Sequence, residues 1–335
     1  MSARVCSPAG DRRRLAIRTA IGAAILGLVS VSIAGYADDR VRFALGVLRR
    51  DGLLLPFASY DGKSWDTPWP LESRRGIGII VPLTLKDVPA DWWGGVGSDA
   101  AWTAWFPDGR SRPLTLAAPI RIPVFCSMRL AVRTDYMGAP KRPGDPTAPK
   151  DALAMAGAPP PLQPIEHVTR DSADWGEMTA LIADKFNRAE RHAANTFSHW
   201  SHPYRAQERE TIPFHLESYY RAPMSQAGWT ASYVEAIREF PARPRDRGCG
   251  LITYAFGWVL RGPGKPPDID LGARVTYCDR NDIPFMFPFG RLELGGDSSW
   301  VYQLSSWRDE YYSVVRTRPG ETRQMAGYNG GYCER

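Results

Sequence analysis

Two glutamates are the residues whose spacing could support catalysis. Glu217 and Glu235 each lie in a short segment that is typical of a β-strand and that includes apolar or aromatic residues before and after the glutamate. Glycoside hydrolysis requires two carboxylates about 5–9 Å apart, one of which acts as a general acid. Acidic residues on neighbouring strands also pair commonly with arginines, and Arg221 and Arg238 are close in the sequence. Glu217 and Glu235 are therefore candidate catalytic residues, with structural ion pairs as the alternative.

Tryptophan is a second residue type that could bind a ligand, and the chain has 12 of them. Aromatic faces stack on sugar rings and on cations. Trp92 and Trp93 are followed by two glycines, which is typical of a loop. Adjacent residues of a strand point to opposite faces, so an extended segment would place at most one of the two in the core. Trp92 and Trp93 are candidate carbohydrate-binding residues, and packing in a β-core is the alternative.

Motifs for other chemistries are missing from the sequence. There is no G-x-S-x-G nucleophile motif, and Gly264-Lys265 lacks the upstream glycine of a phosphate-binding loop. The five histidines all fall between His167 and His215, but no H-E-x-x-H motif occurs among them. We therefore expect no metal site and no cofactor.

The cysteines predict two disulfides. Cys6 lies in the N-terminal leader, and the four that follow it are Cys126, Cys249, Cys278 and Cys333. Residues 251–260 and 269–277 both have strand character, and a hairpin centred near Gly264 would place Cys249 opposite Cys278. This favours the pairs Cys249–Cys278 and Cys126–Cys333, the second of which would join the two halves of the chain. Such pairing is expected in an exported protein.

The N-terminus has the pattern of an export signal. An arginine-rich segment ends at Arg18, and residues 19–37 carry no charge. Gly35 and Ala37 are small residues at the −3 and −1 positions of a cleavage site after Ala37. The alternative is an uncleaved membrane anchor, because about 18 apolar residues can span a bilayer. In both cases the rest of the chain is extracytoplasmic, either secreted or periplasmic after cleavage or held at the membrane by residues 19–37.

The basic charge of the chain gives no argument for nucleic-acid binding. The net charge is +6, of which residues 1–37 carry +4 and the remaining residues only +2. The chain has 335 residues and 44% hydrophobic residues, which is too apolar for a disordered chain and enough for a large core. We therefore expect a folded protein without a nucleic-acid partner.

The sequence divides into four regions. Residues 1–37 form the leader, and residues 38–137 are almost entirely of strand character. Residues 138–164 include eight prolines and predict a flexible or polyproline-like linker. In residues 165–335 one amphipathic helix, near 172–194, precedes a second β region.

Short strands at near-regular spacing, with a single helix, predict a mainly antiparallel β protein. Both a propeller-like fold and a sandwich fit this pattern. A weak internal repeat relates residues 43–49 to residues 254–261, and repetition favours a propeller. The sequence leaves the choice between the two architectures open.

These observations favour an exported β-rich binding or scaffolding protein without chemistry of its own. The aromatic residues suggest a carbohydrate or another cell-envelope component as the partner. The alternative is a secreted hydrolase that acts on glycans with Glu217 and Glu235. A third hypothesis is a membrane-anchored assembly subunit, which requires that residues 19–37 are not cleaved from the rest of the chain.

Overall fold

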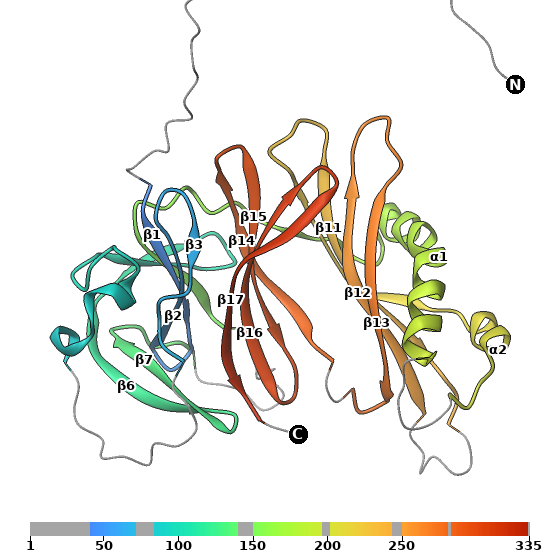
Figure 1. Ribbon diagram of the computed structural model, residues 1–335, viewed down its shortest axis with the longest axis horizontal. Helices are drawn as coiled ribbons and strands as arrows, with labels where there is room; N and C mark the ends of the chain where they lie inside the picture. The colour runs from blue at the N-terminus through green and yellow to red at the C-terminus, as the bar shows by residue number, and fades with distance from the viewer. Residues whose placement is uncertain are drawn as a thin grey trace, which may run out of the picture. The chain divides into compact units, whose positions relative to one another are not determined.

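The protein is mainly antiparallel β, as the sequence predicted (Figure 1). The computed structural model describes residues 41–71, 84–139, 150–195, 202–242, 250–280 and 283–333. Strands make up 51% of the described residues and helices 14%. The strands form sheets of eight, four and five members. The described residues therefore do not form the repeated four-stranded blades of a propeller, and the two copies of the weak repeat lie in different sheets.

The first half of the chain folds into the eight-stranded sheet. Its strands are β1 (Phe43–Leu48), β2 (Leu53–Tyr60), β3 (Trp65–Asp66), β4 (Trp102–Trp105), β5 (Ser111–Leu114), β6 (Leu116–Val124), β7 (Ser127–Thr134) and β8 (Ala152–Gly157). They are arranged in the order β5-β4-β8-β1-β2-β7-β6, and β3 pairs with β2 beside this path. Two short 3-10 helices, η1 (Leu85–Asp87) and η2 (Ala90–Trp93), lie in the connection from β3 to β4.

The last four strands follow one another in a four-stranded sheet. They are β14 (Phe285–Leu294), β15 (Asp297–Ser305), β16 (Asp309–Arg318) and β17 (Glu321–Tyr332). The turn between the first two consists of Gly295 and Gly296, with φ of 59° and 81°. A two-residue hairpin turn with two positive φ values favours glycine at both positions, so the local sequence determines this hairpin.

The five-stranded sheet carries the predicted helix. Its strands are β9 (Glu166–His167), β10 (His215–Pro223), β11 (Thr230–Glu239), β12 (Leu251–Arg261) and β13 (Asp268–Tyr277). Helix α1 (Ala173–Asn195) covers one face of the sheet, and a short helix, α2 (Ala206–Thr211), follows it. Met178, Ile182 and Phe186 recur every four residues on α1 and are fully buried against the sheet.

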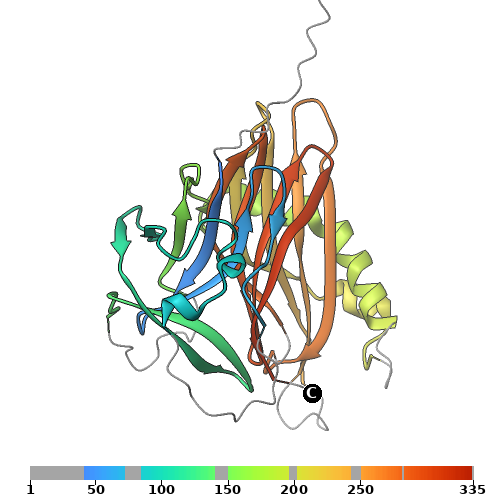
Figure 2. The same cartoon turned by 60° about the vertical axis from the view of Figure 1, so that its left-hand side comes forward.

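The four-stranded sheet is buried on both faces and lies between the other two sheets (Figures 1 and 2). On one face the Tyr312 ring contacts Phe57 of β2, with ring centroids 5.5 Å apart. On the other face Trp300 packs edge-to-face against Trp258 of β12, with centroids 5.0 Å apart. The layers are therefore the eight-stranded sheet, the four-stranded sheet, the five-stranded sheet and α1, in that order.

The proline-rich segment 138–164 is not simply a linker. Residues 152–157 form β8, which pairs with β1 on one side and with β4 on the other. Five of its six residues are buried, and most of them are alanines. A strand buried on both faces loses the alternation of apolar and polar residues that identifies a half-buried strand. The prediction of a linker is wrong for these residues for that reason.

Five further elements were not predicted, namely η1, η2, β9, α2 and β17. The longest is β17, whose sequence lacks regular alternation and includes Gly327, Gly330 and Gly331. A Cβ atom at Gly327 would overlap the Tyr311 side chain, and one at Gly330 would press on Tyr312 and Glu310. The large side chains of β16 therefore require glycines in β17, which weakens the local strand signal.

The predicted leader, residues 1–37, and the predicted strand at 77–83 lie outside the described residues. Among the residues that the structure does describe, no helix is both long and apolar enough to cross a membrane.

Candidate functional site

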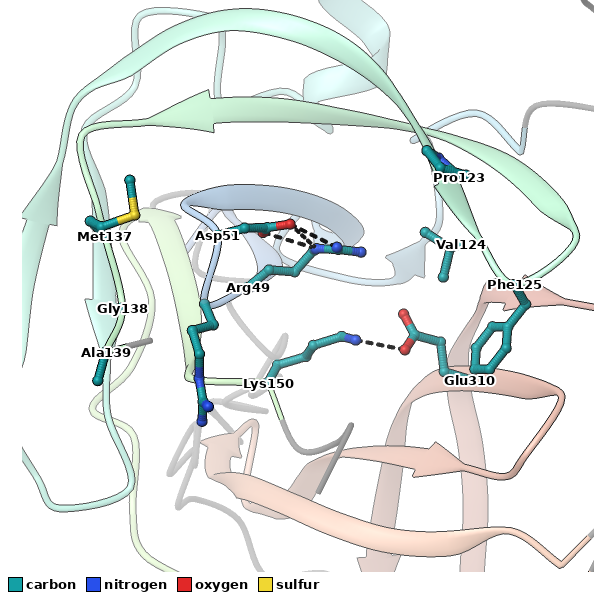
Figure 3. Close-up of a pocket in the computed structure, with 11 residues that line it drawn as sticks. Arg49, Asp51, Pro123, Val124, Phe125, Met137, Gly138, Ala139, Lys150 and Glu310 are labelled. Carbon is teal, nitrogen blue, oxygen red and sulfur yellow. Dashed lines mark hydrogen bonds and ion pairs between the residues drawn. The ribbon is translucent and has the colours of Figure 1, made fainter. Parts of the chain in front are cut away.

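A pocket of about 520 Å³ opens beside the first residues of β16 (Figure 3). The turn between β1 and β2, the turn between β6 and β7, the segment after β7 and the segment before β8 form its walls. Glu310 is the residue that β16 contributes. Pockets of this volume accommodate small ligands.

Lys150 and Glu310 form a buried ion pair in this pocket. The Lys150 Nζ lies 2.6 Å from the Glu310 Oε2, and the two side chains are 11% and 4% exposed. Tyr312 donates its hydroxyl hydrogen to the other oxygen of Glu310. Burial raises the pKa of Tyr312 well above its ordinary value, and the charge of Glu310 adds to this rise. Because both of its oxygens accept hydrogen bonds, the Glu310 carboxylate is held in one orientation.

Each arginine of the pocket is bonded to an aspartate. The Arg49 Nη2 lies 2.8 Å from the Asp51 Oδ2. Burial acts to raise the pKa of Asp51, but the hydrogen bond and charge of Arg49 outweigh it, so this pKa lies below its ordinary value. The Arg50 Nε lies 3.3 Å from Asp151, which also accepts the Tyr136 hydroxyl hydrogen at 2.8 Å. The pocket therefore presents groups of both signs in fixed positions.

Two apolar side chains stand at the rim of the pocket. Met137 is 78% exposed and Phe125 is 40% exposed. Phe125 is the first of two turn residues between β6 and β7, and its φ is 55°. Glycine is favoured at such a position, and a bulky residue there costs about 1–3 kcal/mol. The strained turn holds the Phe125 ring beside Glu310 (Figure 3).

The Cys126–Cys333 disulfide fixes this turn and confirms the predicted pairing. Cys126 is the second turn residue, and its Cα lies 4.6 Å from that of Cys333, just after β17. The Cys333 N–H donates to the Arg308 carbonyl at 2.8 Å. The neighbouring Trp307 is 71% exposed in the turn between β15 and β16. The disulfide thus joins the two halves of the chain next to two exposed aromatic residues.

The second predicted disulfide involves a residue outside the described part of the chain, Cys249. Cys278 is disulfide-bonded. Its N–H donates to the Gly250 carbonyl at 2.9 Å, and Leu251 pairs with Tyr277 in the preceding position of the ladder. The hairpin therefore has the register from which the Cys249–Cys278 pairing was predicted.

The candidate catalytic pair lies in the five-stranded sheet, but one of its members is closed off from solvent. Glu235 pairs across the ladder with Ser218, the residue that follows Glu217 in β10. Glu235 is 0% exposed and accepts the Met286 N–H at 2.7 Å. Burial raises the pKa of Glu235 to about 7, and the charge of Glu217 contributes to the rise. Glu217 is paired with Arg280 at 2.7 Å. A glycan could not reach Glu235 in this structure, so the two carboxylates do not form an open hydrolytic site.

Trp92 and Trp93 lie in η2, and the structure places them differently from the sequence-based expectation. Trp93 is only 1% exposed and packs edge-to-face against Trp69 and Trp102, with centroids 5.2 and 6.5 Å away. The prediction of Trp93 as a binding residue is therefore wrong. The physical reason is that η2 lies directly on β2, so close that a Cβ atom at Gly94 would overlap Ser59. Trp92 is half-buried at the edge of the same aromatic cluster.

Sequence reasoning did not find the pocket residues. Lys150 lies in the segment expected to be a linker, and Glu310 precedes a predicted strand by one residue. The two are 160 positions apart, and nothing local connects them. The sequence indicated one wall of the pocket, because Asp51-Gly52 predicted the turn between β1 and β2. In the described part of the chain, no group of three histidine, cysteine or acidic residues is arranged to hold a metal ion.

Comparisons of the chain with protein-family models, with curated proteins and with solved structures found no match.

Proposed function

We propose that this protein is an exported binding protein that holds a cell-envelope fragment in the pocket around Lys150 and Glu310. The observation that carries the proposal is a buried ion pair that faces an open pocket of about 520 Å³. A cation, an anion and two apolar side chains at the rim are the elements from which small-molecule sites are built.

The ion pair favours a ligand that carries charges of both signs. A buried ion pair adds little net stability, because the desolvation of the two charges offsets their attraction. A ligand with an amine and a carboxylate can bond Glu310 and Lys150 respectively, and this exchange leaves no buried charge unpaired. Phe125 and Met137 add exposed apolar surface for the aliphatic part or a sugar ring. A glycan that bears a short peptide combines these features.

An extracytoplasmic location supports the choice of an envelope ligand. Disulfides persist in oxidising compartments, and the Cys126–Cys333 disulfide fixes the turn that holds Phe125 at the pocket. The leader-like residues 1–37 favour the same location. The alternative function, a glycan hydrolase, has less support because Glu235 is fully buried and Glu217 is paired with Arg280.

Calorimetric titration with three probes tests the proposal. The probes are a muropeptide with free amine and carboxylate groups, the same muropeptide with its amine acetylated, and a neutral chitin oligosaccharide. The pocket variant is Lys150→Met/Glu310→Gln, which removes both charges and leaves an acceptor for Tyr312. The matched control is Arg110→Met/Asp108→Asn, which removes an exposed ion pair outside the pocket.

We expect the unmodified muropeptide to bind most tightly. The pocket variant should bind it at least about tenfold more weakly, and the control should bind it as the wild type does. Equal affinity in the pocket variant, equal affinity for the neutral oligosaccharide, or no binding of any probe would contradict the proposal. Release of hydrolysed products that stops in Glu217→Gln would support the hydrolase instead.

A further inference from the structure

Two exposed aromatic side chains stand on turns beside the pocket. Trp307, in the turn between β15 and β16, is 71% exposed, and Phe125, in the turn between β6 and β7, is 40% exposed. Tryptophan is highly buried on average in folded proteins. An aromatic side chain buries about 150–250 Å² when it is covered, so these two rings leave a large apolar area in contact with water. We call Phe125 and Trp307 the aromatic shelf.

The turn that carries Trp307 is fixed by hydrogen bonds, although the ring itself is mostly exposed. The Ser306 N–H donates to the Asp309 carbonyl at 2.8 Å. The Ser306 hydroxyl oxygen accepts the N–H groups of Arg308 and Asp309 at 3.1 and 3.2 Å, and its hydrogen is donated to the Asp309 carboxylate. The backbone on both sides of Trp307 is therefore held in place before a ligand arrives, which lowers the entropy cost of binding.

The turns that carry the two rings are joined to each other. Cys126 follows Phe125 and forms the disulfide with Cys333. The Cys333 N–H donates to the carbonyl of Arg308, the residue that follows Trp307. These links keep the Cα atoms of Phe125 and Trp307 within about 20 Å of each other. Because Phe125 also lines the pocket, the aromatic shelf continues the pocket on one side (Figure 3).

The conformation of Phe125 and the place of the shelf both favour a glycan as its ligand. The φ of Phe125 is 55°, and strain of this kind in a bulky residue clusters at ligand-binding and active sites. The exposed faces of aromatic rings stack on sugar rings. A sugar chain whose end lies in the pocket passes over Phe125 and reaches Trp307, whereas the flat surface of a lipid bilayer could not enter the pocket.

We propose that this protein holds the end of a long glycan strand, with the peptide-bearing sugar in the pocket and the sugars that follow it stacked on Phe125 and Trp307. This inference rests on the proposed function, because the pocket must bind the charged end of the strand. It adds that the affinity increases with the length of the strand, and that Trp307 is responsible for the increase.

Calorimetric titration of the full chain with two probes that share one charged end tests the inference. The short probe is a disaccharide muropeptide, and the long probe is an octasaccharide that carries the same peptide on its terminal sugar only. The wild type should bind the long probe about tenfold more tightly than the short probe. Trp307→Ala should lose this difference and bind the short probe as the wild type does. Trp307→Phe keeps an aromatic ring and should retain most of the difference.

The matched control is Tyr277→Ala, because Tyr277 is an exposed aromatic residue of another sheet, and this variant should bind both probes as the wild type does. The inference is overturned if the wild type binds the two probes equally, or if Trp307→Ala keeps the difference or weakens both probes to the same extent. Equal affinity for the two probes, with binding to anionic phospholipid vesicles that Trp307→Ala abolishes, would assign the shelf to a lipid surface instead. If the wild type binds neither probe, the proposed function itself is wrong, and this inference is overturned with it.

Discussion

Glu235 should make this protein less stable as the pH rises, because the pKa of its buried carboxyl group is raised in the folded state. Its carboxyl group is 0% exposed, between the five-stranded and the four-stranded sheets. Burial raises its pKa to about 7, although the Met286 N–H and the hydroxyls of Ser218 and Tyr254 act to lower it. An acid whose pKa is higher in the folded state takes up a proton on folding. The folded state is therefore favoured at low pH, where the carboxyl group is neutral in both states.

The size of this effect follows from the two pKa values. The ordinary pKa of the group is 4.5 and its folded value is about 7. One pKa unit corresponds to about 1.4 kcal/mol, so the difference amounts to about 3 kcal/mol. This contribution is fully present below pH 4.5 and is lost as the pH rises from 4.5 to 7.

The substitution Glu235→Gln removes the titration and keeps an acceptor for the Met286 N–H. We expect the variant to be about as stable as the wild type near pH 4.5 and more stable by up to about 3 kcal/mol at pH 8. With a denaturant slope of about 3 kcal/mol per molar, the urea midpoint of the variant at pH 8 should be higher by about 1 M. Urea unfolding at pH 5, 6, 7 and 8 measures this difference.

The control is Glu177→Gln, because Glu177 is exposed on α1. Its urea midpoint should differ from that of the wild type by the same small amount at every pH. If Glu235→Gln also shows a constant difference between pH 5 and pH 8, the buried carboxyl group does not titrate in this range. The reasoning from burial would then be wrong.

Three further substitutions test other parts of the structure by the free energy of unfolding. Lys150→Met should cost about 3–5 kcal/mol because it leaves the buried Glu310 carboxylate without its cation, and adding Glu310→Gln should restore most of the loss. Replacing both Cys126 and Cys333 by alanine should lower stability by about 2–4 kcal/mol, measured by urea unfolding without reductant, and an unchanged midpoint would contradict a structural role. Trp93→Ala should cost about 3–5 kcal/mol in thermal or urea unfolding, whereas a ligand-contacting surface residue would cost far less.

The sequence determined those features that depend on neighbouring residues. The 3.6-residue period of Met178, Ile182 and Phe186 identified α1, because a helix that covers a sheet buries one stripe. Alternation and turn residues identified most strands of the three sheets. The hairpin of β12 and β13 was predicted in register, since its ladder continues from Leu251 and Tyr277 to Gly250 and Cys278.

Tertiary structure decided burial wherever a segment has partners on both sides. β8 lies between two strands, and its buried alanines show no alternation that could reveal it. Trp93 was expected at a surface because glycines follow it, yet its loop lies on β2 and fills the core. A residue's exposure depends on what covers it, and this is set by contacts far away in the sequence.

The candidate site is the clearest example of a feature that tertiary contacts determine and local sequence does not. Arg49, Lys150 and Glu310 come from three distant segments, and each segment by itself has the composition of a turn, a linker or a strand end. Local patterns specify strands, turns and helices because those depend on backbone geometry and on the side chains nearby. The order of the strands and the stacking of the sheets depend on which apolar faces bury one another, and only this packing brought the charges of the pocket together.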